Sequence, residues 1–493
     1  MVGGGLAGVA ATVALAERGL AVTLHEAEDH LGGRLGGWAD TLATGEPFEM
    51  DRGFHAVFRQ YYNLRRLLRR VDPELAGLTP IDDYPLVGPG GAVESFAGLP
   101  QRPPFNLFAL VRRTPTLGWR ELRRVDAGAA LHMLRYDPVT TYQRFDAISA
   151  TGYLDSIGFP DHARQMLFDV FAHSFFNPED EMSAAELLMM FHLYFLGSSE
   201  GLLFDVLDEA FSDAVWTPMA RYLRSLGVDL RLGSTVDAIE GGGSGGWVVS
   251  GEPADAVVLA LPVQPLRAVV AASPDVGAGD PAWREAVDRL APAPPFAVWR
   301  LWLDRPTRAD RAPFVGTAGL GIIDNISCVH RYQGAARRWA ARTGGSVVEL
   351  HAYALDPTRD DASTKAELRA RLHELYPETA AAGVVDERWL VRADCPAFRP
   401  GSAADRPGVT TPEPTVALAG DLVQLPFPSA LMERAAASGF LAANHLLARW
   451  GLEQEPVWSI PPRGILAGRN RRIGGLGTAP SWMRGMGLRH RRR

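Results

Sequence analysis

Apolar and polar positions along the chain predict alternating helices and strands, beginning at the N-terminus. An Ala- and Leu-rich run from Val9 to Arg18 predicts a helix, and Gly19 predicts its end. The next six residues, Leu20 to His25, read LAVTLH and have the period of two that is typical of a strand. A helix followed directly by a strand is typical of an α/β protein.

Further elements are predicted in the middle of the chain and near its C-terminus. Residues 228–239 (VDLRLGSTVDAI) have a strand–turn–strand pattern, and a glycine-rich turn follows at 241–246. Two apolar strands are predicted at 255–262 (DAVVLALP) and 415–419 (TVALA). A helix is predicted from about Leu431 to Leu447, where MERAAASGFLAANHLL has small residues that permit close packing.

The segments between these elements predict strands at Ala297–Leu303 (AVWRLWL) and Ser346–Ala354 (SVVELHAYA), and a helix near Thr364–Leu375. Ala184 to Leu196 contains one charged residue, Glu186, and predicts a buried helix that is too short to span a bilayer.

The glycines before the first helix form a G-x-G-x-x-G motif, made of Gly3, Gly5 and Gly8. In nucleotide-binding units the first glycine permits a tight turn, the second lets the backbone approach a pyrophosphate, and the third allows close helix packing. Glu26 follows the predicted strand, at the position where an acidic side chain accepts hydrogen bonds from a ribose. These features together predict a dinucleotide-binding βαβ unit.

The first strand of this unit is short, since only Met1 and Val2 precede Gly3. Such units usually have several apolar residues before the first glycine, and a parallel sheet without its central strand would contain a gap. We therefore expect the natural protein to begin upstream of Met1.

Two further motifs indicate which dinucleotide is bound. Leu31-Gly32-Gly33-Arg34 combines a loop that can pass close to a cofactor with a guanidinium that can face phosphates. Near the C-terminus, Gly420 and Asp421 end a predicted strand, and an aspartate at a strand end can bind a ribityl hydroxyl. The N-terminus of the helix that begins near Leu431 favours negative charge, for instance at a flavin carbonyl.

Composition limits the possible partners. The 493 residues are enough for two or three domains, and the two cysteines, Cys328 and Cys395, exclude a disulfide framework and a cysteine-rich metal site. We therefore expect no metal and a reducing, cytoplasmic location. The net charge is −7, although the segment from Arg463 to Arg493 holds nine arginines and no acidic residue.

A nucleic-acid enzyme would carry positive charge over its body, so no nucleic-acid partner is expected. The basic tail is either a solvated chain end or a contact with an anionic membrane surface.

In this order, the glycine motif, the Gly-Gly-Arg loop, the central strands and the Gly-Asp strand end resemble the FAD-dependent amine oxidase and carotene desaturase superfamily, over nearly the whole chain. Two stretches narrow the resemblance: Asp51-Arg52-Gly53-Phe54-His55, which continues into AVFRQYYNLRRLLRR, and the segment from Phe175 to Val206. Both are similar to the bacterial isorenieratene synthase group, the β-carotene desaturase/methylases that aromatise a terminal ionone ring.

The resemblance implies an α/β fold in which a discontinuous, Rossmann-like FAD-binding domain carries an inserted α+β substrate domain. The FAD domain is expected at 1–75, 212–262 and 412–450, the substrate domain at 76–211 and 263–411, and a basic C-terminal tail at 451–493. The resemblance also implies that Gly53 and Met432 contact the cofactor and that Val236 offers its backbone to the adenine.

The resemblance implies a reaction in which hydrogen is removed from a ring carbon, hydride passes to the flavin and a methyl group migrates. A cationic intermediate needs apolar, aromatic walls, because water would quench it. The matching segments supply aromatic residues, for each of which core packing is the alternative role: Phe54, Phe58, Tyr61, Tyr62, Phe191, Tyr194, Phe195 and Phe427.

Two histidines lie in the matching segments. His55 should face the isoalloxazine and is the candidate catalytic base, because imidazole titrates near neutrality. Its alternative role is a neutral histidine bonded to the backbone. His192 lies in the apolar run MMFHLYF, which favours a packed core histidine. The electron acceptor that reoxidises the flavin stays open.

The substrate class implied is a hydrophobic carotenoid, which dissolves only in lipid, so a peripheral membrane enzyme is expected. No segment reaches the ~18–20 uninterrupted apolar residues of a spanning helix. Pro103 to Leu110 (PPFNLFAL) either dips into a membrane interface or packs on the core.

Other enzyme classes remain as alternatives. Amine oxidases usually have a tyrosine near the C-terminal flavin motif and a lysine that holds a water, whereas DLVQLPFPSALMERA contains no tyrosine and Lys365 lies outside any motif. Another polyene desaturase or a hydroxysqualene-type dehydroxylase is a closer alternative. A methyltransferase would have no use for Gly420-Asp421, and a carotenoid-binding protein without catalysis is the non-enzyme alternative.

Overall fold

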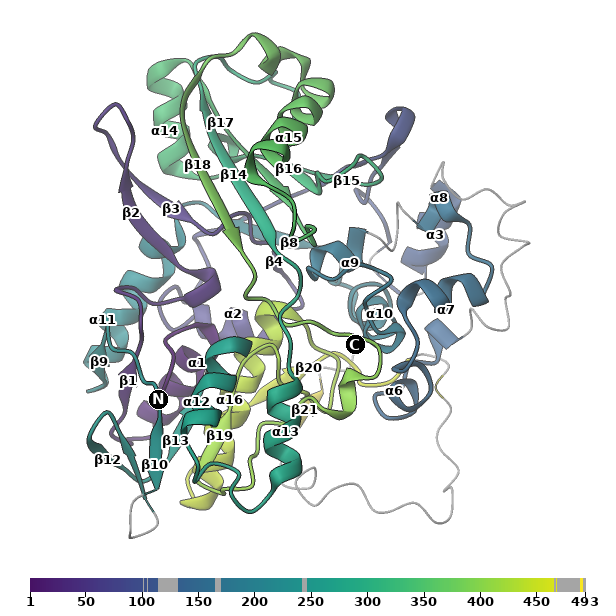
Figure 1. Cartoon of the computed structure of the whole chain (residues 1–493). Coiled ribbons are helices and arrows are strands. Elements are labelled where there is room, and N and C mark those ends of the chain that lie inside the picture. Colours follow the sequence, from purple (N-terminus) through teal and green to yellow (C-terminus); the bar gives the residue numbers. More distant parts are fainter. Residues whose placement is uncertain are drawn as a thin grey trace.

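The structure, a computed structural model, describes residues 1–100, 102–103, 105–113, 132–164, 170–241, 246–464, 467 and 488–490. Three parts are visible in Figure 1: a parallel sheet in the lower part of the view, a mixed sheet above it, and a group of helices on the right. The parallel sheet contains the N-terminus of the chain.

The parallel sheet is built from short strands that come from distant parts of the chain. Its strands are β1 (Thr23–His25), β9 (Asp229–Arg231), β13 (Val257–Leu259) and β19 (Val416–Leu418). β1 pairs with β9 and β13 pairs with β19, in both cases in parallel. Every residue of β13 and β19 is buried, as expected of a parallel sheet that is covered on both faces.

Val2 joins these two pairs of strands into one sheet. It bridges in parallel to His25 on one side and to Leu259 on the other. Gly3 N donates to His25 O at 2.8 Å, and Val2 N donates to Val258 O at 2.9 Å. Val2 thus occupies the central position between the two pairs of strands, and the expected upstream start of the natural protein stays a prediction.

Two long apolar helices pack on this sheet and on one another. Helix α1 (Leu6–Ala16) is buried along its whole length, and α16 (Leu431–Arg449) lies against it. At Gly439 the two backbones come so close that a Cβ atom would lie 2.2 Å from Ala7 O and 2.9 Å from Ala10 Cβ. The small residues predicted for the C-terminal helix therefore serve this contact.

The mixed sheet has seven strands in the order β18–β14–β17–β16–β15–β6–β7. Only the β15–β6 pair is parallel. The strands are β6 (Leu86–Val87), β7 (Val93–Glu94), β14 (Phe296–Leu303), β15 (Phe314–Thr317), β16 (Asn325–Cys328), β17 (Ser346–Ala352) and β18 (Val384–Arg392).

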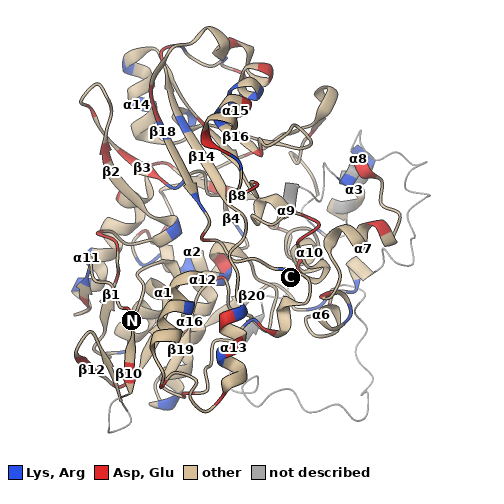
Figure 2. Ribbon diagram, viewed as in Figure 1, with Lys and Arg blue, Asp and Glu red and all other residues tan. Residues whose placement is uncertain are grey.

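Helices cover both faces of this sheet, which explains why all residues of β14 and β17 are buried. Trp299 and Leu301 pack in one cluster with α15 (Asp361–Leu375), whereas Trp302 packs in another cluster with α14 (Gly334–Thr343). Figure 2 shows charged residues of both signs along α15 and none on α1.

The remaining helices lie around the two sheets. They are α2 (Tyr62–Leu68), α3 (Phe105–Arg113), α6 (Thr140–Phe145), α7 (Ala150–Ser156), α8 (Asp161–Arg164), α9 (Val170–Ser174), α10 (Ala184–Phe191), α11 (Thr217–Ser225), α12 (Val263–Ala272) and α13 (Pro281–Arg289). Two π-helical turns accompany them, η4 (His192–Leu196) and η5 (Ser212–Trp216).

Smaller strand groups complete the described chain. They are β2 (Gly37–Thr41) with β3 (Pro47–Asp51), β4 (Val57–Phe58) with β8 (Phe204–Leu207) and β5 (Leu78–Pro80), β10 (Ile239–Gly241) with β11 (Trp247–Val249) and β12 (Glu252–Ala254), and β20 (Val457–Ser459) with β21 (Leu488–His490).

The predicted α/β class is confirmed by a helix-covered parallel sheet combined with a mixed sheet. The buried helix predicted at 184–196 consists of α10 and η4, and all of its residues are buried. The domain bounds stay a prediction, and most of the basic tail lies outside the described residues. Within the described part of the chain, no helix is both long and apolar enough to cross a bilayer.

The contact between α1 and α16 predicts the effect of a single methyl group. Gly439→Ala should lower the free energy of unfolding by about 1–3 kcal/mol, because backbone atoms of α1 cannot move aside without separating the helices. The midpoint of thermal unfolding measures this change. Gly279→Ala is the control, since a Cβ at that exposed glycine meets nothing within 4 Å. Equal midpoints for both variants would contradict the close packing.

Candidate active site

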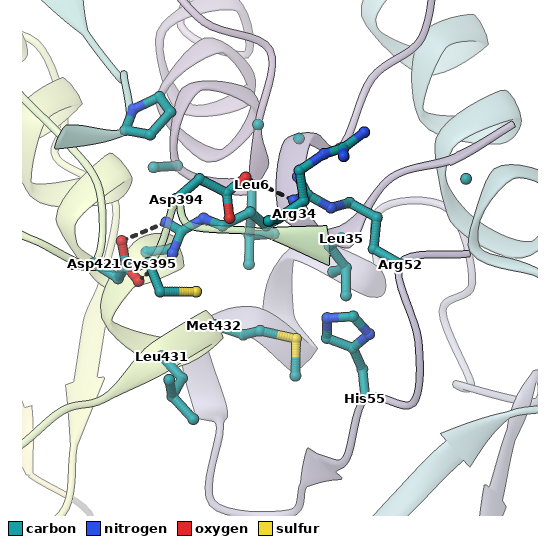
Figure 3. A pocket seen from close by; sticks show the side chains of 18 of the residues that line it. Leu6, Arg34, Leu35, Arg52, His55, Asp394, Cys395, Asp421, Leu431 and Met432 are labelled. Carbon is teal, nitrogen blue, oxygen red and sulfur yellow. Dashed lines mark hydrogen bonds and ion pairs between the residues drawn. The ribbon is translucent and has the colours of Figure 1, made fainter. Parts of the chain in front are cut away.

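A cavity of about 1200 Å³ extends from the glycine loop before α1 to the mixed sheet. Figure 3 shows that residues from both ends of the chain meet in it. Arg34 and His55 come from the N-terminal part, and Cys395, Asp421 and Met432 come from the C-terminal part.

The three glycines of the motif have the geometry that each predicted role requires. Gly3 has φ +99°, and a Cβ there would lie 2.4 Å from Ala260 O in the neighbouring strand. Gly5 lines the cavity, and a Cβ there would meet only Gly33, at 3.9 Å. Gly8 packs so tightly that a Cβ would lie 1.9 Å from Gly3 O. Gly3 and Gly5 both line the cavity, and of the three glycines Gly5 has the most open space around it.

Glu26 lies at the end of β1 and lines the cavity next to this loop. Its carboxylate accepts hydrogen bonds from Gly4 N at 2.6 Å and from Glu28 N at 2.9 Å. Each carboxylate oxygen has a further lone pair, so the group can also accept hydroxyl donors from the cavity.

Arg34 and Asp421 pair with one another across the cavity, as the dashed lines in Figure 3 show. The Arg34 nitrogens lie 2.8 and 2.5 Å from the two Asp421 oxygens. Gly32 and Gly33 both have positive φ, at +111° and +54°, and bring the loop that carries Arg34 against Gly5. The predicted phosphate-facing and ribityl-facing groups are thus neighbours.

The C-terminal motif presents a helix N-terminus to the same cavity. Gly420 has φ +140°, and Leu431, the first residue of α16, has φ +49°, which a branched side chain rarely adopts. No side chain caps α16, and Leu431 and Met432 line the cavity. The free backbone N–H groups of this helix end favour a partner with negative charge. Val236 lines the cavity as well.

His55 lines the cavity and Gly53 lies against its wall. His55 Nδ1 lies 2.8 Å from Gly53 O, so Nδ1 donates and Nε2 is the ring's acceptor. Burial lowers the pKa of His55 to about 4, which favours the neutral histidine bonded to the backbone, and its role as the catalytic base stays a prediction. Gly53 has φ +105°, and a Cβ there would lie 2.7 Å from the His351 ring.

Aromatic rings form the wall of the cavity that faces away from the glycine loop. Among the predicted aromatic residues, Phe54, Phe58, Tyr61 and Tyr194 line it. The hydroxyl groups of Tyr61 and Tyr194 form a hydrogen bond with one another at 2.6 Å. Rings that the sequence did not single out complete the wall: Tyr84, Phe96, Phe176, Phe204, Phe296, Phe314 and Tyr353.

The other predicted aromatic residues and His192 do not line this cavity. The predicted aromatic residues outside the cavity lining are Tyr62, Phe191, Phe195 and Phe427. His192 Nε2 lies 2.9 Å from Pro461 O, and its ring stacks on Tyr136. Burial lowers the pKa of His192 to about 4, which fits a neutral core histidine.

A polar cluster on the mixed sheet is part of the cavity wall that sequence reasoning missed. His351 and Tyr353 line the cavity, and Glu349 lies behind them, fully buried. His351 Nε2 lies 2.8 Å from Glu349 Oε1, and His351 Nδ1 lies 2.6 Å from the Tyr353 hydroxyl. The signal was present in SVVELHAYA, in which Glu349, His351 and Tyr353 fall at every second position and so on one face of a buried strand.

Charges in this cluster are closely paired. Arg300 Nε and Nη2 each lie 2.8 Å from Glu349 Oε2, and Arg300 Nη2 lies 3.9 Å from Asp51. Burial acts to raise the pKa of Glu349, but Arg300 and His351 outweigh it and lower that pKa to about 2. Burial raises the pKa of Asp51 to about 6.

The features near the glycine loop fit a bound dinucleotide with a flavin. They combine an open glycine turn, an acid at a strand end, a guanidinium, and helix N-termini without side-chain caps. Among the described residues, no group of three or more His, Cys, Asp or Glu is placed to hold a metal ion.

Comparison with solved structures identifies the fold. Cyclohexylamine oxidase from Brevibacterium oxydans IH-35A superposes with a TM-score of 0.66 over 91% of this chain and 98% of its own, at 15% sequence identity. Wild-type putrescine oxidase bound to putrescine gives a TM-score of 0.65 at 17% identity, with the same coverage.

Comparison of sequences identifies closer relatives. A carotenoid phi-ring synthase of Streptomyces griseus is 51% identical over 468 residues, which cover 94% of this chain and 90% of that protein. A carotenoid phi-ring synthase of Chlorobaculum tepidum is 28% identical and covers 95% of this chain and 91% of its own.

The family of flavin-containing amine oxidoreductases matches residues 6–447, from the first turn of α1 almost to the end of α16. The expected FAD cofactor and the oxidoreductase class are thereby confirmed. The chain belongs to the family of flavin-containing amine oxidoreductases.

Proposed function

We propose that this protein is an FAD-dependent carotenoid oxidoreductase that desaturates and aromatises a β-ionone ring with migration of a methyl group. The 51% identity to a carotenoid phi-ring synthase over 94% of the chain carries the proposal. The aromatic wall of the cavity supports it, because a hydrocarbon ring needs an apolar site and offers no group for a salt bridge.

The residues of the FAD site are part of the proposal. Gly5 and the N-terminus of α1 receive the pyrophosphate, together with the Arg34 guanidinium. Glu26 accepts hydrogen bonds from the adenosine ribose, and Asp421 accepts one from the ribityl chain.

The remaining proposed contacts are with the two ends of the cofactor, the adenine and the flavin ring. Val236 offers its backbone to the adenine, while Met432 and the N-terminus of α16 face the flavin ring. Gly32, Gly33 and Gly420 let the backbone approach the cofactor, whereas Gly53 and Gly8 make room for packing behind it.

A ring with one double bond needs two more to become aromatic, which requires two two-electron oxidations. FAD, when bound in this cavity, would supply the hydride acceptor for both oxidations. The protein binds the ring against aromatic side chains, excludes water from a substrate cation, and takes up the proton that each oxidation releases. His55 is the candidate to contact the ring, because its neutral Nε2 is an acceptor.

Peripheral binding to a membrane is part of the proposal as well. Phe105 and Phe108 on α3 are 62% and 64% exposed, and Arg112 and Arg113 end the helix. Asn106, on the opposite side, donates to Phe195 O at 2.6 Å and holds α3 against the π-helical turn η4. Aromatic rings beside arginines are typical of a helix that lies in a membrane interface.

The central experiment is expression in cells that accumulate β-carotene, with extraction and chromatography of the pigment. We expect an aromatic carotenoid with a blue-shifted spectrum. Unchanged β-carotene beside a protein with bound FAD would contradict the proposed function and favour another polyene or a squalene-type substrate.

The role of Glu26 predicts a selective loss of affinity. Glu26→Gln should weaken FAD binding by about tenfold, since a hydrogen bond to a charged group contributes about 1.5–3 kcal/mol. Binding of FMN, which lacks the adenosine ribose, should not change. Quenching of flavin fluorescence on titration with apoprotein measures both. Glu240→Gln, at an exposed position outside the cavity, is the control, and equal losses for FAD and FMN would contradict the ribose contact.

The exposed rings of α3 predict the behaviour of the protein with vesicles. Replacing Phe105 and Phe108 by serine should abolish cosedimentation with phosphatidylglycerol/phosphatidylcholine vesicles, because the apolar contact with the interface is lost. Replacing Val384 and Val385, which are exposed on β18, by serine is the matched control. Cosedimentation of the phenylalanine variant at the wild-type level would refute binding through α3.

A further inference from the structure

The polar cluster on β17 forms a connected chain of hydrogen bonds that ends in the cavity. Glu349 is 0% and His351 is 2% exposed, and the side chain of Tyr353 is partly exposed to the cavity. Because the three residues alternate along the chain, they share one side of the strand and its extension.

The direction of each hydrogen bond in this chain follows from its partners. Glu349 is held as a carboxylate by Arg300 and can only accept a hydrogen bond. Phe54 N also lies 3.3 Å from His351 Nε2, but the carboxylate is closer, at 2.8 Å, and carries the charge, so we assign the hydrogen to Nε2, which donates to Glu349. The neutral ring then has an acceptor at Nδ1, to which the Tyr353 hydroxyl donates at 2.6 Å.

Asn325 fixes the remaining side of the tyrosine. Its Nδ2 donates to the Tyr353 oxygen at 3.0 Å, which leaves the hydroxyl hydrogen to His351. The tyrosine ring is held edge-on against Phe176, at a ring distance of 4.9 Å, and its backbone N donates to Asp324 at 2.6 Å. The hydrogen bonds with His351 and Asn325 and the packing of the ring on Phe176 thus fix the orientation of the Tyr353 hydroxyl at the edge of the cavity.

The charges around this chain of hydrogen bonds favour the uptake of one proton. Two carboxylates, Glu349 and Asp51, lie on a single guanidinium, that of Arg300. The cluster therefore has one negative charge in excess when both carboxylates are ionised, and an imidazolium at His351 would balance it. Within the described part of the chain, the hydrogen bond given for the His55 ring is the one with Gly53 O, and burial lowers the pKa of His55 to about 4.

We propose that Tyr353, with His351 and Glu349 behind it, is the acid–base group that takes the proton from the substrate ring. This inference rests on the proposed function and adds to it the residues that accept the proton. Tyr353 and His351 are catalytic residues in this proposal, since they line the cavity, and Glu349 is a positioning residue.

The step balances as follows. Loss of hydride to FAD, the oxidant, leaves a cation on the ring. A neighbouring C–H bond then breaks, its electron pair forms the new double bond, and its proton goes to the Tyr353 oxygen. The hydroxyl proton of Tyr353 passes to His351 Nδ1 at the same time, and Glu349 stabilises the imidazolium through Nε2–H.

The test compares purified Tyr353→Phe and Glu349→Gln with the matched control Tyr332→Phe. Tyr332 is a buried tyrosine near Arg300 that does not line the cavity. We expect Tyr353→Phe to lower kcat on β-carotene by roughly 100-fold with little change in KM, the range that general acid–base catalysis contributes. FAD content and the midpoint of thermal unfolding should equal those of the control.

A second readout does not depend on the reaction. In apoprotein labelled with ¹⁵N-histidine, the His351 signal, assigned by its absence in His351→Gln, should show an unprotonated Nδ1 and a protonated Nε2. Tyr353→Phe should shift the Nδ1 resonance and Glu349→Gln the Nε2 resonance, while Tyr332→Phe leaves both unchanged.

The outcomes separate the two proposals. Wild-type protein that forms no aromatic carotenoid would refute the proposed function and this inference with it. Wild-type protein that forms the product, with kcat of Tyr353→Phe within twofold of the control, would overturn the inference alone. A His351 signal that does not respond to Tyr353→Phe would also overturn it.

Discussion

The close contact between α1 and α16 is the constraint on which the rest of the structure depends. The two helices begin at opposite ends of the cavity wall, one after the glycine loop and the other after the Gly-Asp strand end. Their spacing, set by Gly439 against Ala7, determines how far apart the two ends of the cofactor site lie. The pair of Arg34 and Asp421, 387 residues apart in sequence, lies beside the cavity ends of these two helices.

The sequence predicts those parts of the fold that depend on a single residue and its neighbours along the chain. Glycines that need positive φ or that exclude a Cβ, such as Gly3 and Gly420, follow from the conformation of a single residue and its neighbours. Glu26 follows from its position directly after a strand. The pairing of Val2 with both neighbouring strands could not be predicted, because a pattern of apolar residues along the chain does not contain the hydrogen bonds between strands.

The polar cluster could not be assembled from sequence, because its members meet only through pairing of distant strands. Arg300 lies opposite Glu349 in the register of β14 and β17, and Asp51 reaches Arg300 from the end of β3. Arg300 and Glu349 are each the one charged residue of their buried strand, and the sequence does not show that they pair with one another or with Asp51. Alternation along β17 could have revealed that Glu349 and His351 share a face, but not which cavity they border.

The burial of these charged residues argues against a purely structural role for the cluster. Removing charges from water costs several kcal/mol per ion, and well-packed apolar residues of similar volume often stabilise a core as well as an ion pair does. Aromatic rings such as Phe176, Phe296 and Phe314 also line this cavity, so the fold has apolar side chains of suitable size for such positions. Water must be kept from a ring cation, yet the proton that leaves the ring must be accepted. A chain of hydrogen bonds whose inner end is buried meets both demands, since it accepts a proton without admitting water.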